Sequence, residues 1–193
     1  MSDPVLHVLA GPNGAGKSTL YEAVVGPATR LEFINADIIA AERWPDDPSG
    51  RSYDAATAAS DRRYELLNER RSFVTETVFS HESKLELIRT AVEAEYLVTL
   101  HVVAVPEDLA VARVAKRVSL GGHAVPENKV RERYRRLWPL VADAIKLVDY
   151  AVVYDNSRAA PAFRVVATFE RGSLVGSAHW PPWTPKALRA VNA

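Results

Sequence analysis

The sequence predicts an α/β fold in which a mostly parallel sheet is flanked by helices. Two observations support this prediction. Apolar segments of strand length recur along the 193-residue chain, and segments with helical periodicity fill the gaps between them, an alternation typical of parallel sheets. The segments 97–105 and 151–153 are also nearly continuous in valine and leucine, as expected for strands buried on both faces.

The predicted strands of the parallel sheet are Val5–Ala10, Glu32–Ala36, Ser72–Thr77, Thr99–Val105 and Tyr150–Tyr154. Prolines followed by acids, at positions 106–108 and 126–127, indicate the first turns of two helices. Near the C-terminus, the segments 163–169 and 174–178 flank residues 170–173 and predict a hairpin at the sheet edge. We expect a single domain over residues 1–193, with the hairpin and tail at about 160–193.

The composition narrows the classes of partner. Lysine and arginine total 24, as do aspartate and glutamate, so no overall positive field attracts nucleic acid or anionic lipid, and neither is expected as a partner. There is no cysteine, which excludes disulfides and thiolate metal sites. Without a long apolar stretch or a signal-peptide pattern, the chain is expected to be cytoplasmic.

A phosphate-binding loop follows the first predicted strand. Residues 11–18 read GPNGAGKS and match the pattern GxxxxGK[ST] between a strand and a helix. The glycines let backbone N–H groups converge on phosphate oxygens, while Lys17 reaches the β and γ phosphates and Ser18 binds Mg²⁺. We therefore expect ATP and Mg²⁺ as cofactors, with nucleotide contacts from Gly11, Pro12, Asn13, Gly14, Ala15, Gly16, Lys17, Ser18 and Thr19.

Two acids favour a kinase over a nucleotide switch. The strand ending at Val105 lacks the terminal aspartate of switch ATPases and GTPases, whereas Asp37 follows an early strand and Glu76 lies in another, beside Thr77. A carboxylate there can orient an acceptor hydroxyl and accept its proton, so Asp37 is the expected catalytic base, with Glu76 and Thr77 as substrate contacts. Two alternatives stay open: Asp37 as a helix N-cap, and Glu76 in an ion pair with an arginine.

A basic segment at about 113–137 is the expected lid. Two predicted helices flank residues 121–123, and arginines at the margins of their apolar stripes can fold over a nucleotide and stabilise the transferring phosphoryl group. The alternative is a solvated charged face, which we expect for Lys116, Arg135 and Arg136. The predicted lid contacts are Arg113 and Arg117 with nucleotide, Arg117 and Arg133 in catalysis, and His123, Arg131 and Arg133 with substrate.

Asn156 is a further expected nucleotide contact. It lies in the segment 155–158, which ends the last buried strand near the expected place of the adenine. A turn after that strand would use the same residues.

Several motifs together resemble the zeta toxin family of P-loop kinases, in particular its short, stand-alone members. They are GPNGAGKST at 11–19, FINAD at 33–37, SFVTET at 72–77, RVSLGGHAVP at 117–126, RERY at 131–134 and DNS at 155–157. The resemblance implies an adenylate-kinase-like core, Asp37 as catalytic base, and Lys17 with the lid arginines as phosphate contacts. It further implies UDP-N-acetylglucosamine as acceptor and a small antitoxin protein as partner.

The sequence thus supports two functions from different classes. The leading hypothesis is an ATP-dependent phosphotransferase that acts on the hydroxyl of a small-molecule acceptor, such as a sugar nucleotide. The alternative is a regulatory binding module that hydrolyses ATP slowly and signals by closure of the lid.

Overall fold

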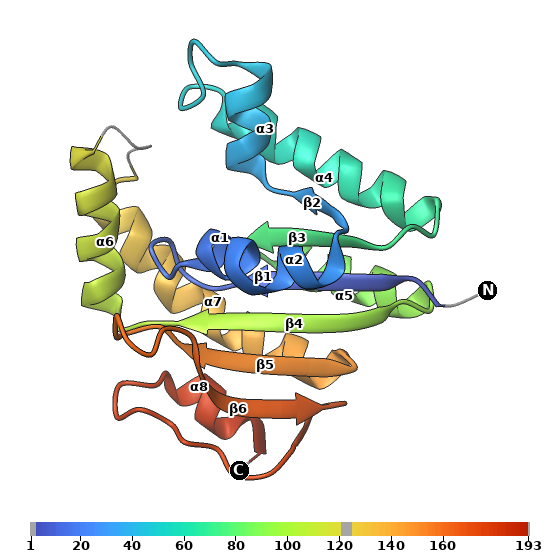
Figure 1. Ribbon diagram of the computed structural model, residues 1–193, viewed down its shortest axis with the longest axis vertical. Helices are drawn as coiled ribbons and strands as arrows, with labels where there is room; N and C mark the ends of the chain where they lie inside the picture. The colour runs from blue at the N-terminus through green and yellow to red at the C-terminus, as the bar shows by residue number, and fades with distance from the viewer. Residues whose placement is uncertain (1–2, 121–124, 193) are drawn as a thin grey trace.

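The structure is a computed structural model that describes residues 3–120 and 125–192. Its centre is a seven-stranded sheet in the order β2-β3-β1-β4-β5-β6-β7 (Figure 1). The first five strands along the chain are parallel and the last two antiparallel, which confirms the predicted α/β class. Their bounds are β1 Val5–Ala10, β2 Glu32–Ile34, β3 Phe73–Thr77, β4 Leu97–Ala104, β5 Tyr150–Asp155, β6 Arg164–Glu170 and β7 Ser173–Leu174.

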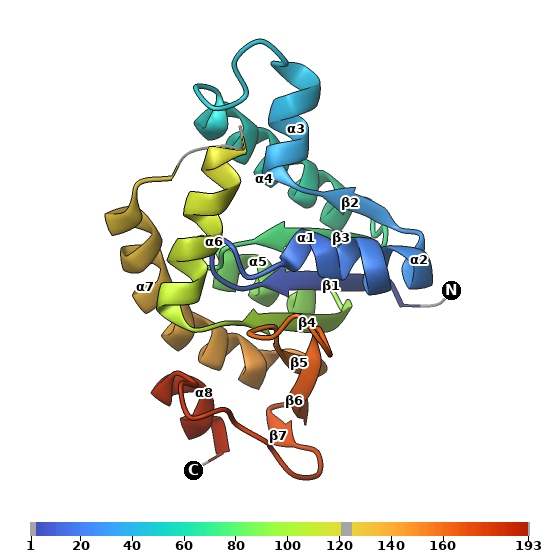
Figure 2. The ribbon, with the colours of Figure 1, turned by 60° about the vertical axis from the view of Figure 1, so that its left-hand side comes forward.

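Helices cover both faces of this sheet. Figures 1 and 2 show the segment from α1 to α2 on one face and α5 with α7 on the other. Two further helices, α3 and α4, lie at the β2 edge, and α6 stands beyond the carboxyl ends of the strands. The bounds are α1 Lys17–Leu20, the π-helix η1 Tyr21–Val25, α2 Gly26–Thr29, α3 Ala36–Arg43, α4 Ser52–Asn68, α5 Glu82–Glu93, α6 Glu107–Ser119, α7 Glu127–Leu147, α8 Lys186–Arg189 and the 3₁₀-helix η2 Ala190–Asn192.

The central strands are apolar because both of their faces are covered. In β4, every residue from Leu100 to Ala104 is buried, as the continuous apolar run predicts. The second half of α7 joins this core through Leu137, Val141 and Ile145, none of which is exposed to solvent. The expected lid segment therefore ends in a helix that is anchored in the core.

The C-terminal hairpin forms at the predicted place but is shorter than predicted. Arg171 and Gly172 form its turn with left-handed φ values of 46° and 77°. The second strand contains only Ser173 and Leu174, instead of running from 174 to 178. After it the chain leads to α8, which packs against α7 at the far edge of the sheet (Figure 2).

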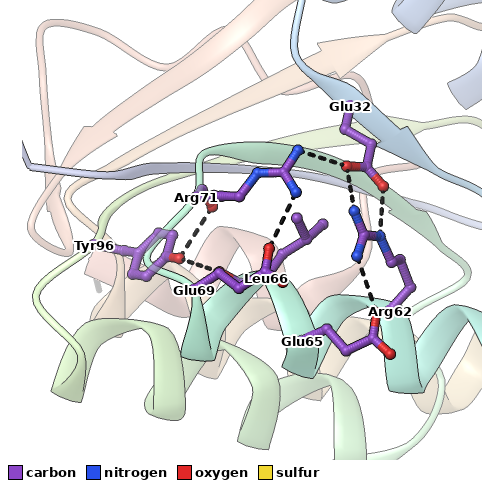
Figure 3. A network of polar contacts seen from close by, with 7 residues as sticks. All are labelled: Glu32, Arg62, Glu65, Leu66, Glu69, Arg71 and Tyr96. Atoms are coloured by element: carbon purple, nitrogen blue, oxygen red, sulfur yellow. Dashed lines mark hydrogen bonds and ion pairs between the residues drawn. The ribbon is translucent and has the colours of Figure 1, made fainter.

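A polar network attaches α4 to the opposite edge (Figure 3). The Arg62 guanidinium donates to both carboxylate oxygens of Glu32 in β2, at 2.7 and 2.8 Å, and holds the pKa of that carboxyl below its usual range. Arg71 donates to the same carboxylate at 3.3 Å. The Tyr96 hydroxyl lies 2.9 Å from the carbonyl oxygen of Leu66 and 3.0 Å from that of Arg71, and shares its proton between them. These contacts fix the orientation of α4 against the sheet.

In the part of the chain that the structure describes, no helix is long and apolar enough to cross a membrane.

Candidate functional site

A cleft of about 970 Å³ opens where β1 and β3 end. In open α/β sheets, ligands bind at these carboxyl ends. The lining comes from parts of the chain that are far apart in sequence: the loop after β1, the start of α3, α4, the segment after β3 with the start of α5, the helices α6 and α7, and the end of β5. The cleft therefore exists only in the folded chain.

The loop between β1 and α1 has a backbone conformation that requires glycine at two positions. Gly14 and Gly16 have left-handed φ values of 76° and 95°, which side chains with a Cβ rarely adopt. A Cβ atom on Gly16 would also lie 2.5 Å from the Nδ2 atom of Asn156. The conformation and the close packing both depend on glycine, as expected for a loop that presents its backbone to phosphate.

Asn156 is part of the support for this loop. Its Nδ2 group donates to the carbonyl oxygen of Ala15 at 2.8 Å, and the residue also lines the cleft. The turn after β5 uses its neighbour instead, because the Ser157 N–H donates to the Asp155 carboxylate at 2.8 Å. The side chain of Asn156 is therefore not needed for the turn and supports the phosphate-binding loop.

Lys17 is the buried cation of the cleft. Its side chain is 6% exposed, donates to the carbonyl oxygen of Pro12 at 3.1 Å, and lies 3.7 Å from the Glu76 carboxylate. Burial lowers the pKa of Lys17, the charges of Glu76 and Asp37 raise it, and the charge of Arg117 lowers it. All these charges are therefore close to one ammonium group. A buried lysine surrounded in this way is well suited to an anionic ligand.

Glu76 connects the loop to β2. It accepts hydrogen bonds from the Ser18 hydroxyl at 2.7 Å and from the Asn35 amide at 2.9 Å. Of the two interpretations left open, the ion pair with an arginine is wrong, because the cation beside Glu76 is Lys17. Asn35 was not predicted as a site residue, although it lies in the same FINAD segment as Asp37.

Asp37 does not cap α3. The N-cap is Asn35, whose side-chain oxygen accepts from the backbone N–H groups of Asp37 at 2.7 Å and of Ile38 at 3.4 Å. The capping interpretation of Asp37 is therefore wrong. Asp37 lies in the first turn of the helix, is exposed, and lines both the main cleft and an adjoining cavity of about 210 Å³ that Arg117 also lines.

The lid arginines separate into two groups. Arg113, Arg117 and Arg133 line the cleft, and Arg113 reaches the Gly14 carbonyl oxygen at 3.5 Å. Arg131 is outside the lining: its guanidinium pairs with the carboxylates of Glu107, Asp108 and Glu127 at 2.8 to 3.3 Å. Three carboxylates hold Arg131 at the junction of α6 and α7, away from the cleft, so the structure does not support its predicted contact with substrate. His123 lies outside the described residues.

Most of the other predicted residues lie together in the cleft. Gly11, Pro12 and Ala15 do not line it; they are buried behind the loop, where Gly11 packs against the backbone of Val103. Arg135 and Arg136 are exposed and ion-paired, as expected for a solvated face. The predicted residues in the lining are Asn13, Gly14, Gly16, Lys17, Ser18, Thr19, Asp37, Glu76, Thr77, Arg113, Arg117, Arg133 and Asn156.

Three cations of the cleft, Arg63, Lys84 and Lys129, were not predicted. Arg63 in α4 is 4% exposed, and burial lowers its pKa to about 10; Lys84 in α5 is half-buried. For Arg63 a signal was present, because it shares one helical face with Ala55, Ala59 and Leu66, which are all buried. An arginine on an apolar helical face indicates a specific role.

Comparisons with known proteins identify the family and the fold. Residues 6–140 match the model of a protein family described as an AAA domain. A relative from Haemophilus influenzae, described as an uncharacterized protein, is 30% identical over 125 residues, which are 64% of this chain and 88% of the relative.

Solved structures extend the likeness to the whole fold. A protein from Chloroflexus aurantiacus named as a candidate kinase is 19% identical, with a TM-score of 0.55 over 70% of this chain and 79% of its own. The AvrRxo1-ORF1:-ORF2 complex with ATP is 15% identical, with a TM-score of 0.70 over 90% of this chain and 60% of its own. A structure from the PezAT toxin–antitoxin system of Streptococcus pneumoniae is 13% identical, with a TM-score of 0.63 over 87% of this chain and 72% of its own. The fold is thus that of P-loop kinases.

Proposed function

The chain belongs to the AAA-domain family, and from this premise we propose that it is an ATP-dependent kinase that phosphorylates the hydroxyl group of a small molecule. The observation that carries the proposal is the arrangement around Lys17. A carboxylate suited to act as a base, Asp37, and an arginine from the lid, Arg117, both act electrostatically on the ammonium group that is expected to hold the β and γ phosphates.

ATP binding rests on the loop and its supports. Backbone N–H groups of residues 14–19 surround the phosphates, and Lys17 neutralises charge on the β and γ groups. Ser18 and Glu76, whose side chains are hydrogen-bonded to each other, are the residues that would hold Mg²⁺. When bound, the metal ion neutralises charge on the phosphates as the γ-phosphoryl group moves.

The transfer step then needs a base and a closing lid. Asp37 accepts the proton of the acceptor hydroxyl while the hydroxyl oxygen bonds to the γ-phosphorus and the bond to the β-phosphate oxygen breaks, leaving ADP. Arg117 and Arg133 stabilise the charge on the transferring group from the lid side. Arg113 couples the first lid helix to the loop through Gly14.

The acceptor and the partner are proposed from likeness. The resemblance to zeta toxins supports a sugar nucleotide such as UDP-N-acetylglucosamine as acceptor and an antitoxin protein as partner. The cytoplasmic location stays a prediction made from the sequence. The similarity in fold to a structure from the PezAT toxin–antitoxin system supports the antitoxin partner alone.

The base assignment is tested with Asp37→Asn. This variant keeps the size of the side chain but cannot accept the proton, so we expect kcat to fall by about 100-fold or more with ATP affinity unchanged. Transfer is measured by phosphorus NMR or mass spectrometry over a panel of alcohols. Glu42→Gln, on the same helix but outside the cleft, is the control and should retain the wild-type rate.

Two outcomes would count against the proposal. Wild-type transfer by Asp37→Asn would exclude Asp37 as the base. If no alcohol in the panel is phosphorylated and a protein partner is captured only when ATP is bound, the chain is a nucleotide-dependent binding module instead.

A further inference from the structure

Arg63 has more hydrogen-bonding capacity than the fold uses. Its Nε group donates to the Thr75 hydroxyl at 2.9 Å, and that hydroxyl donates to the Ile34 carbonyl oxygen at 3.1 Å. This contact braces α4 against β3 and occupies one N–H group. A guanidinium carries five N–H donors. The remaining donors of Arg63 have no protein partner within residues 3–120 and 125–192, and the side chain lines the cleft.

Lys84 lies close to this guanidinium. It begins the inner face of α5, lines the same cleft, and has a pKa lowered first by burial and then by the positive charge of Arg63. No ion pair joins either cation to a carboxylate of the described chain, whereas the lid cations Arg131, Arg135 and Arg136 are all ion-paired. Two neighbouring, partly desolvated cations are unfavourable unless a negative charge binds between them.

The position of the pair separates it from the expected nucleotide contacts. Those contacts come from the loop after β1, from α6 and from the end of β5, whereas Arg63 and Lys84 come from α4 and α5. Arg63 is attached to Thr75, the residue before Glu76, at the end of β3. The pair therefore belongs to the part of the cleft that Glu76 and the β3–α5 segment form.

We infer that Arg63 and Lys84 bind an anionic group on the phosphoryl acceptor, so that the substrate class is an alcohol that already carries a phosphate or a carboxylate. This inference rests on the proposed kinase function. A phosphate oxygen or carboxylate would accept hydrogen bonds from the remaining N–H groups of Arg63 and neutralise the positive charges of Arg63 and Lys84. The acceptor hydroxyl would lie elsewhere on the same molecule, toward Asp37.

The anion site is tested first by binding, without reference to catalysis. Inorganic pyrophosphate is titrated by calorimetry into protein saturated with Mg²⁺ and a non-hydrolysable ATP analogue, so that the phosphate loop is already filled. We expect Arg63→Gln and Lys84→Gln each to weaken binding by about tenfold or more. Lys129→Gln is the matched control, because Lys129 lines the same cleft but pairs with Glu132 at 3.2 Å, and it should bind as wild type.

Folding must be separated from binding for the buried arginine. Arg63→Lys keeps the charge, and circular dichroism with thermal unfolding identifies any variant that has lost its structure. Lys84 is half-buried and its side chain has no hydrogen-bond partner within the described residues, so Lys84→Gln remains informative if Arg63→Gln fails to fold. Equal weakening in Lys129→Gln, or none in Lys84→Gln, overturns the site.

The substrate class is tested with pairs of acceptors that differ in one group. Neutral sugars are compared with their phosphates and with sugar acids. We expect the charged member to have a kcat/KM higher by about tenfold or more in the wild type, and Lys84→Gln to reduce that preference. The phosphate and acid arms identify which anion is recognised.

The results also separate this inference from the kinase proposal. If pyrophosphate binds through Arg63 and Lys84 but no alcohol is phosphorylated, the kinase function fails and the anion site stands. If neutral alcohols are phosphorylated as well as charged ones and pyrophosphate binding is insensitive to both variants, the kinase function stands and the anion site fails.

Discussion

Lys17 is a buried cation whose charge is only partly compensated by the protein, an arrangement that favours ligand binding over the stability of the ligand-free fold. Its ammonium group is 6% exposed, and burial lowers its pKa in spite of the nearby carboxylates. The counter-charge within the protein is limited, because Glu76 also accepts hydrogen bonds from Ser18 and Asn35. An incoming phosphate would supply the missing negative charge.

Replacing Lys17 alone or together with Glu76 tests this balance. Lys17→Met leaves the Glu76 carboxylate without its cation, so we expect the free energy of unfolding to fall by ~3–5 kcal/mol. Lys17→Met with Glu76→Gln removes both charges, and replacement of a whole buried ion pair is often neutral or stabilising by ~1–4 kcal/mol. We expect both variants to lose ATP binding, and urea denaturation and calorimetry with ATP measure the two effects. The exposed Lys116→Met is the control, and a double variant less stable than Lys17→Met would contradict the interpretation.

At the scale of the element, α7 carries two arginines, two positions apart, whose environments differ. Arg131 joins α7 to the first turn of α6 through Glu107 and Asp108, while Arg133 lines the cleft. Helical geometry explains the separation, because residues two positions apart point about 200° around the helix axis from each other. The ion pairs of Arg131 position the lid helices, and Arg133 is available to the ligand.

A pair of variants distinguishes these roles. Arg131→Gln should change the midpoint of unfolding only slightly, since exposed ion pairs contribute little, and should leave the rate of phosphoryl transfer within about twofold of wild type. Arg133→Gln should leave the midpoint unchanged and slow transfer by about tenfold or more. Steady-state kinetics and urea unfolding on both variants check this. The opposite pattern would exchange the two assignments.

At the scale of the whole molecule, three strands share a partly buried chain of polar side chains, with His101 at its buried centre. The His7 Nδ1 atom of β1 lies 3.1 Å from Nε2 of His101 in β4, and Nδ1 of His101 lies 3.3 Å from the Tyr154 hydroxyl in β5. Burial, followed by the charge of His7, lowers the pKa of His101 to about 4, and burial lowers that of His7. The folded sheet thus favours neutral imidazoles.

This chain of groups makes stability depend on pH. An unfolded histidine titrates at about 6.5, so between pH 6.5 and 4 the unfolded state binds more protons than the folded state, and the free energy of unfolding falls as the pH falls. The full effect of His101 is on the order of 3 kcal/mol. We expect His101→Val to flatten the pH dependence of urea denaturation over this range, whereas the exposed His179→Gln should not. An unchanged slope in His101→Val would assign the effect to other groups.

Much of the fold could be predicted because local pattern and burial coincide. The strands of the parallel sheet were predicted to within one or two residues at each end, since apolar runs with turn residues between them are a direct consequence of burial on both faces. The hairpin turn was predicted at residues 170–173, which contain Arg171 and Gly172, but the length of its second strand was overestimated. An apolar residue at 175 indicates strand propensity and does not reveal that the regular ladder with β6 ends at Leu174, beyond which Val175 still donates one backbone hydrogen bond to Thr168 at 2.8 Å.

The candidate site was harder to predict from the sequence where a residue's role depends on which partner its side chain contacts. The pattern around Asp37 allowed a cap or a base, and only the hydrogen bonds of Asn35 exclude the cap. The spacing on α7 placed Arg131 and Arg133 at the two margins of the apolar stripe, where they were equivalent in sequence. In the structure, carboxylates of α6 pair with Arg131 and not with Arg133. Lys84 gave no signal, because a half-buried lysine on an amphipathic helix is ordinary.

The sequence by itself determined the α/β class, the phosphate loop and the set of charged residues from which the site is drawn. These depend on composition, periodicity and short motifs, which are properties of neighbouring residues. Only the tertiary structure decided that Lys17, Glu76 and Asp37 share one electrostatic environment, that Arg131 is ion-paired with the first turn of α6, and that Arg63 faces the cleft beside Lys84. The physical reason is that charge pairing and desolvation depend on distances between residues that are remote in the chain.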